Sequence, residues 1–151
     1  MRTIAFEELP SLVGREIGTS DWLTIDQERI DRFADATSDH QWIHTDLERA
    51  KRDMPDGKTI AHGFLTLSLI SALAAQIMRV TGVARGINYG LNKVRFTNAV
   101  QSGSRVRARQ KLLAVERRGE AMQIASEFII EIENQGRPAC VAETLGLLYP
   151  R

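Results

Sequence analysis

Hydrophobic and polar residues follow different periods in the two parts of the chain. Up to about residue 80, apolar residues recur three and four positions apart, the spacing of an amphipathic helix. Ile30, Phe33 and Ala34 show this spacing behind Asp26, a good helix N-cap. The expected elements there are an amphipathic lead-in at 1–12, a strand at 16–25, and helices at 27–36, 46–52 and 63–78.

After Gly86 the apolar residues alternate with polar ones, which is typical of strands. Short turns, such as Arg118-Gly119-Glu120, separate the alternating segments. Short connections of this kind favour an antiparallel sheet. The four strands expected are 86–97, 104–115, 122–133 and 138–149.

The helix expected at 63–78 has no formal charge and is apolar on almost every side. A helix of this kind is normally wrapped by other elements. An antiparallel sheet around it would satisfy the burial needs of both. The pattern therefore predicts an α+β protein with a hot-dog fold, formed by residues 1–151 as a single domain.

Residues 59–78 form a run of 20 residues without a formal charge, which is also the length of a membrane span. Seven of these residues are polar or glycine, and no other segment resembles a span. We therefore expect a buried helix and no membrane association.

Composition narrows the classes of function further. The net charge of +1 and the pI of about 8.0 are too balanced to indicate nucleic-acid binding. The single cysteine, Cys140, excludes an internal disulfide framework, and its apolar neighbours suggest an inert buried thiol. Glu7 and Glu8 lie where a signal peptide needs an apolar core, so we expect a cytoplasmic protein.

Candidate chemistry gathers before and at the start of the apolar helix. Asp39 and His44 lie five residues apart in a polar turn, close enough for both side chains to hold one water molecule and move its protons. Gly63 opens the helix, where its N–H has no helical partner and a missing Cβ lets a substrate approach the backbone. Together they offer acid/base catalysis and an oxyanion-binding donor.

Three motifs together resemble the MaoC-like dehydratases, the hydratase-2 or (R)-specific enoyl-CoA hydratase group. They are Phe33-Ala34-x4-Asp39-x4-His44, Ala61-His62-Gly63, and Asn92-Lys-Val-Arg-Phe96 with Gly103 downstream. The segment Asp-His-Gln-Trp-Ile-His resembles the corresponding segment of the nodulation protein N-like branch. The resemblance covers roughly residues 13–149.

The resemblance implies a hot-dog homodimer that acts on acyl thioesters. It implies that Asp39 and His44 are catalytic, that Gly63 forms the oxyanion hole, and that Ser68 is a polar helper. The expected reaction is the reversible hydration of a trans-2-enoyl-CoA to an (R)-3-hydroxyacyl-CoA. Coenzyme A is then part of the substrate, and no metal or redox cofactor is expected.

One departure from the family pattern lies between the two catalytic candidates. Many members have Asn-Pro there, whereas this chain has Gln41-Trp42. Gln41 keeps an amide, and Trp42 replaces the fixed φ of proline with a large ring. We therefore expect Gln41 and Trp42 to contribute to substrate binding and to the shape of the acyl pocket.

Structural alternatives stand beside these roles. Asp39 could form an Asx turn, Ser68 could bond a carbonyl of its own helix, and Trp42 could be core packing. His62 is expected to be structural rather than a second base, and a zinc site from His40 and His44 is disfavoured because the segment is turn-like. The basic residues that share one strand face could bind coenzyme A phosphates, but a solvated outer face is the expected explanation. These are Arg105, Arg107, Arg109 and Lys111.

Two other functions are compatible with the same fold. A hot-dog thioesterase would direct water at the carbonyl carbon and release a free thiol. A non-catalytic acyl-binding or partner subunit would keep the fold without turnover.

Overall fold

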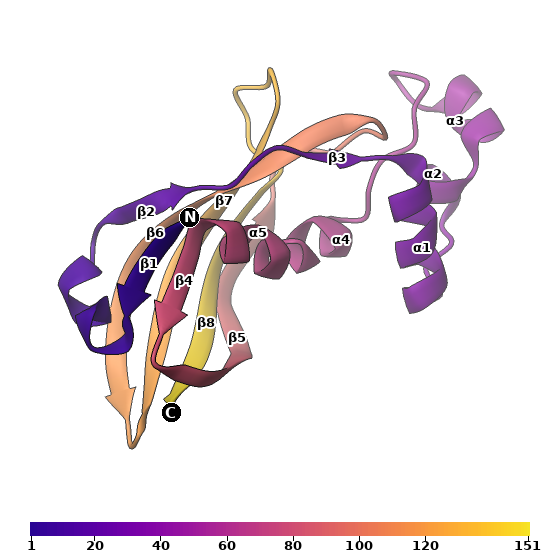
Figure 1. The fold of residues 1–151 in the computed structure, drawn as a ribbon. Coiled ribbons are helices and arrows are strands. Elements are labelled where there is room, and N and C mark those ends of the chain that lie inside the picture. The colour runs from indigo at the N-terminus through magenta and orange to yellow at the C-terminus, as the bar shows by residue number, and fades with distance from the viewer.

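A computed structural model describes all 151 residues and shows a curved antiparallel sheet with a helix on its concave side (Figure 1). The sheet has six strands in the order β2-β6-β7-β8-β5, and β3 pairs with a further part of β6. Its strands are β2 (Glu16–Thr19), β3 (Leu23–Ile25), β5 (Val83–Phe96), β6 (Ser104–Arg118), β7 (Ala121–Ile132) and β8 (Cys140–Pro150). The α+β class and the four expected C-terminal strands are confirmed.

The helices lie between β3 and β5 in the chain. Asp26 caps the first helix as expected, because its carboxylate accepts the N–H of Arg29 at 2.9 Å. Asp46 caps α3 in the same way. The helices are α1 (Gln27–Thr37), α2 (Trp42–Thr45), α3 (Leu47–Asp53), α4 (Gly63–Ser68) and α5 (Ile70–Ile77).

The N-terminal lead-in is not a single amphipathic helix. Residues 2–5 form strand β1 (Arg2–Ala5), and only Phe6–Leu12 is helical, as the 3-10 helix η1. β1 pairs in parallel with β4 (Met78–Thr81) in a small second sheet. This pairing takes Met78 out of the expected helix, because its backbone is extended to meet Arg2.

The strand expected at 16–25 is divided into β2 and β3. Both segments pair with β6, so the two strands keep the same neighbouring strand despite the interruption. Ser20 maintains the connection, because its N–H donates to the Ala108 carbonyl and its hydroxyl accepts the Ala108 N–H, both at 2.9 Å.

The central helix is divided at Leu69 into α4 and α5, and it is not wrapped on every side as expected. Leu73 is fully buried against the sheet, whereas Phe64 is 68% exposed on the opposite face. The sheet therefore buries only one face of this apolar helix.

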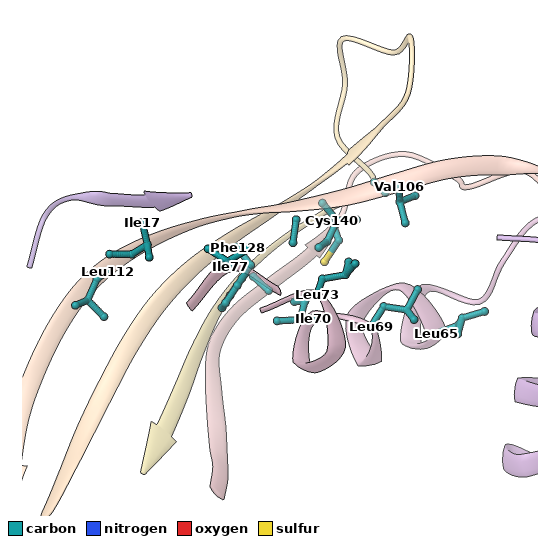
Figure 2. Packing of buried hydrophobic residues seen from close by; sticks show 14 of the residues in the cluster. Ile17, Leu65, Leu69, Ile70, Leu73, Ile77, Val106, Leu112, Phe128 and Cys140 are labelled. Carbon is teal, nitrogen blue, oxygen red and sulfur yellow. The ribbon is translucent and has the colours of Figure 1, made fainter. Parts of the chain in front are cut away.

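The core fills the space between the helix and the concave face of the sheet (Figure 2). Ile70, Leu73 and Ile77 of α5 point toward the strands, where Phe128 and Cys140 meet them. Burial raises the pKa of the Cys140 thiol to about 11, which agrees with an inert packing role.

The basic stripe lies on the outer face of β6, and its three arginines form ion pairs with Glu131 and Glu133. Arg107 bonds Glu131 at 2.7 Å and lies over the Trp22 ring, while Arg105 pairs with Glu133. These ion pairs support the solvated-face explanation over a phosphate site. None of the helices is both long and apolar enough to span a membrane.

Candidate active site

His44 is held on α2 by contacts to two other segments. The Nδ1–H of His44 donates to the Ile60 carbonyl at 2.6 Å, and the Gln27 side-chain amide donates to the His44 carbonyl at 2.7 Å. His44 as a whole is 6% exposed. The stretch expected to be a turn up to His44 therefore ends in a short helix that fixes this imidazole.

The bond to Ile60 determines which nitrogen of His44 can do chemistry. A carbonyl can only accept, so Nδ1 carries the proton and Nε2 of the neutral ring has a free lone pair. Burial lowers the pKa of His44; the bond to Ile60 opposes this, and the nearby His62 lowers the pKa further. Both effects of the surroundings, orientation and a lowered pKa, suit a general base.

Asp39 follows the end of α1, where Ser38 adopts a left-handed conformation with φ of 60°. Its side chain is exposed, and one carboxylate oxygen lies 3.4 Å from the N–H of Gln41, an Asx-turn contact at the long end of hydrogen bonding. Its carbonyl accepts the Nε2–H of His62 at 2.9 Å. The carboxylate is thus left with capacity to accept further hydrogen bonds.

His62 joins the two catalytic candidates. Its ring stacks on that of His44, with centroids 3.7 Å apart and planes inclined by 25°. The Phe33 ring also contacts the His62 ring, with centroids 5.0 Å apart. His62 is 3% exposed, and its Nδ1 has no hydrogen-bond partner in the protein. The expected structural role near the helix start is present, in the form of the bond to the Asp39 carbonyl.

Asp39, His44 and His62 offer ligand atoms that all lie within 4.8 Å of one another. A water molecule or a metal ion could lie among such atoms. Stacked imidazoles direct their in-plane lone pairs side by side rather than toward one point, which suits a bound water better than tetrahedral metal coordination. His40 lies outside this group, 3.6 Å from Asp35 and exposed.

Gly63 begins α4 directly after His62. Its N–H donates to no protein group, so a donor is free at this position. A Cβ placed on Gly63 would lie 2.9 Å from Cδ2 of Phe96. Glycine is therefore required for packing against Phe96 as well as for access to the backbone.

The remaining predicted residues are arranged as follows. The Ser68 hydroxyl donates to the Phe64 carbonyl of its own helix at 2.7 Å, which was its structural alternative. The hydroxyl oxygen can still accept a hydrogen bond. Trp42 is half-buried beneath the guanidinium of Arg49, 4.1 Å from the ring centroid, and Gln41 is exposed. The substrate-binding roles of Ser68, Gln41 and Trp42 stay predictions.

A cavity of about 670 Å³ lies between the helix pair and strands β5 to β8. Leu67 and Ser68 line it, within two turns of Gly63, and 14 of its 23 lining residues are hydrophobic. Its size and lining suit a largely apolar ligand. Neither Gln41 nor Trp42 lines this cavity.

Sequence reasoning underestimated two features of the site. It treated His62 as separate from the catalytic pair, although its position directly before Gly63 already placed it beside the proposed oxyanion donor. It also missed the polar side chains Gln110 and Ser126 in the cavity wall. Their signal was a polar residue on the apolar face of an alternating strand.

Comparison with known proteins extends these observations. The family model described as "MaoC like domain" matches residues 8–129. The 3-hydroxyacyl-thioester dehydratase Z of Mycobacterium tuberculosis is 50% identical over 147 residues, covering 96% of this chain and 97% of its own. Nodulation protein N of Rhizobium leguminosarum bv. viciae is 47% identical over 150 residues, covering 98% and 93%.

A solved structure, the unliganded R-hydratase of Pseudomonas aeruginosa, has the same fold. It superposes with a TM-score of 0.70 at 22% identity, covering 92% of this chain and 83% of that one. The expected hot-dog fold is confirmed. The chain belongs to the MaoC-like dehydratases and is a hydratase/dehydratase enzyme of that family.

Proposed function

We propose that the protein is an (R)-specific enoyl-CoA hydratase, which adds water reversibly to a trans-2-enoyl-CoA to give an (R)-3-hydroxyacyl-CoA. The proposal is carried by the juxtaposition of Asp39 and His44, which offer ligand atoms within 4.8 Å of one another. The bond to Ile60 leaves Nε2 of His44 free. The family and the dehydratase relative support the reaction class.

The reaction requires a water to be activated and a proton to be delivered. In the proposed mechanism the water lies between Asp39 and His44, and its oxygen attacks the β carbon as His44 Nε2 takes a proton. The carbon–carbon double bond becomes an enolate whose charge rests on the thioester oxygen. The proton then passes from the pair to the α carbon, which returns both residues to their starting protonation states.

The Gly63 N–H is the proposed donor to the thioester oxygen. It has no protein partner, and it opens a helix whose first N–H groups are unbonded. A preorganised donor of this kind contributes about 2.7–4 kcal/mol to lowering the barrier. Addition of water neither oxidises nor reduces the substrate, so the proposed reaction uses no redox cofactor, and the two side chains supply the acid/base chemistry without a metal.

The proposed working form is a homodimer. β5 is an edge strand, and large apolar side chains on it are exposed. Phe64, on the uncovered face of the central helix, is exposed beside Phe96, with ring centroids 5.9 Å apart. A second copy would cover both the strand edge and these side chains, which otherwise invite aggregation. The exposed β5 residues are Ile87, Tyr89, Leu91 and Phe96.

The test is hydration of crotonyl-CoA by purified protein, followed by loss of the conjugated double bond, with released thiol measured in parallel. The expected result is double-bond loss without thiol. Asp39→Asn and His44→Ala should each lower kcat by about a hundredfold or more, and His40→Ala is the matched control with normal turnover. Thiol release would favour the thioesterase alternative, and turnover unaffected by either change would contradict the catalytic assignment.

A further inference from the structure

The wall of the cavity contains a polar group that the catalytic mechanism does not use. Gln110 of β6 and Ser126 of β7 both line the cavity, and they are 3% and 1% exposed. They lie on adjacent strands on the concave face of the sheet, in a lining that is otherwise mostly apolar. None of Asp39, His44 and Gly63 belongs to this lining.

The hydrogen bonds of this polar group are incomplete. The Gln110 amide nitrogen donates to the Ser126 hydroxyl at 3.2 Å, and Oε1 of Gln110 has no partner. Reversing the amide would leave its nitrogen with free protons instead, so one end lacks a partner in either orientation. Ser126 accepts the bond from Gln110, which leaves its own hydroxyl proton uncommitted.

A buried amide end without a partner is unfavourable, because the group has lost its water and gained nothing in exchange. Gln110 thus has a buried acceptor and Ser126 a buried donor, side by side in two residues that line the cavity. A hydroxyl group both donates and accepts, so it complements this pair in full.

Small residues elsewhere in the lining leave room for such a ligand. Ser71, Ala74 and Ala75 of α5 and Gly90 of β5 are small residues that line the cavity. Asn88 of β5 donates to the Ser71 hydroxyl at 3.3 Å and ties the strand to the helix there. Ser68, these small residues, Gln110 and Ser126 therefore line one and the same cavity.

We propose that Gln110 and Ser126 form a subsite for a hydroxyl group on the distal part of the acyl chain, so that the substrate class is hydroxylated acyl thioesters. The identification of the ligand as an acyl chain rests on the proposed function. The thioester would lie at Gly63, the chain would enter past Leu67 and Ser68, and its hydroxyl would bond Gln110 and Ser126.

The test measures binding without turnover. Saturated acyl-CoAs have no conjugated double bond to hydrate, so calorimetry can compare unsubstituted chains with ω-hydroxylated chains over a series of lengths. At the lengths that bring the hydroxyl to Gln110, the ω-hydroxylated ligand should bind about tenfold more tightly than its unsubstituted partner.

Two variants in the subsite and one matched control make the test specific. Gln110→Leu and Ser126→Ala should each remove most of the preference for the hydroxylated chain. Gln123→Leu is the control, because Gln123 lies on β7 next to Ile124 of the cavity and so on the opposite face of the strand. The unfolding temperature of Gln110→Leu should change little, since the substitution removes both a buried acceptor without a partner and the single bond to Ser126.

The outcomes separate this proposal from the proposed function. The subsite is overturned if no chain length shows a preference for the hydroxyl, or if the preference survives in both subsite variants. Crotonyl-CoA hydration is measured on the same wild-type preparation. Absence of hydration together with a hydroxyl preference that depends on Gln110 would refute the hydratase activity and leave the subsite supported.

Discussion

The imidazoles of His44 and His62 lie face to face, 3.7 Å apart between centroids, and each ring donates to a backbone carbonyl. His62 donates to the carbonyl of Asp39, so it contacts both proposed catalytic residues. His62 is therefore placed to fix the separation of Asp39 and His44.

Replacing His62 with Phe keeps a ring against His44 but removes the hydrogen bond to Asp39. We expect kcat/KM for crotonyl-CoA to fall about ten- to a hundredfold, because a small misplacement of catalytic groups is costly. His62 also lowers the pKa of His44, so the acid side of the pH profile should move to higher pH. His40→Phe is the control, and a profile unchanged in shape and position would show that His62 has no positioning role.

The acid side of the wild-type profile should itself have an apparent pKa below 6.5. Burial lowers the pKa of His44 from 6.5, and the base must be neutral to accept a proton. Activity therefore persists below pH 6.5 and is lost as the pH falls through the lowered value. An acid side centred above 6.5 would contradict His44 as the base.

The same shift makes stability depend on pH. The unfolded chain binds the proton of His44 more readily than the folded chain does, because the folded pKa is lower. The contribution of His44 to the free energy of unfolding is therefore present above pH 6.5. It is lost as the pH falls through 6.5 toward the folded pKa. Urea unfolding should show a smaller loss of stability over this range in His44→Gln than in the wild type. Equal losses in the two proteins would contradict the assignment.

Gly63→Ala should affect stability and activity for separate reasons. The added Cβ would lie 2.9 Å from the Phe96 ring, which should cost about 1–3 kcal/mol of unfolding free energy. It would also obstruct approach to the N–H, so kcat should fall by about a hundredfold or more. The measurements are urea unfolding and crotonyl-CoA hydration.

The double variant Gly63→Ala/Phe96→Leu separates the two effects. Removing the ring should restore most of the stability, while kcat should stay low because the methyl group remains on the residue whose N–H is the proposed donor. Full recovery of activity in the double variant would show that Gly63 serves packing alone.

Ile87→Glu together with Tyr89→Lys should convert the proposed dimer to a monomer. Both side chains are exposed on the edge strand β5, and charges there oppose pairing with another strand edge. Light scattering coupled to size-exclusion chromatography measures the mass. Leu47→Glu, at an exposed apolar residue of α3, is the control that should keep the wild-type mass, and an unchanged mass in the β5 variant would place the interface elsewhere.

Several features of the protein follow from residues close together in the chain. Asp26 caps its helix as expected and Asp46 caps α3, because a cap depends on a side chain and an N–H three residues away. The long strands β6 and β7 follow from two-residue alternation. The start of a helix at Gly63 also followed from residues close to it in the chain.

Other features depend on partners far along the chain. Met78 is extended because it pairs with Arg2, although its own neighbours favour helix. His62 stacks on His44, 18 positions earlier, and Gln110 meets Ser126 across two strands. The sequence by itself determined most of the helices and strands, the fold class and the catalytic candidates, because local periodicity and short motifs encode them. Only the tertiary structure decided the stacked histidines, the free nitrogen of His44 and the polar cavity wall, because these depend on how distant segments pack and share hydrogen bonds.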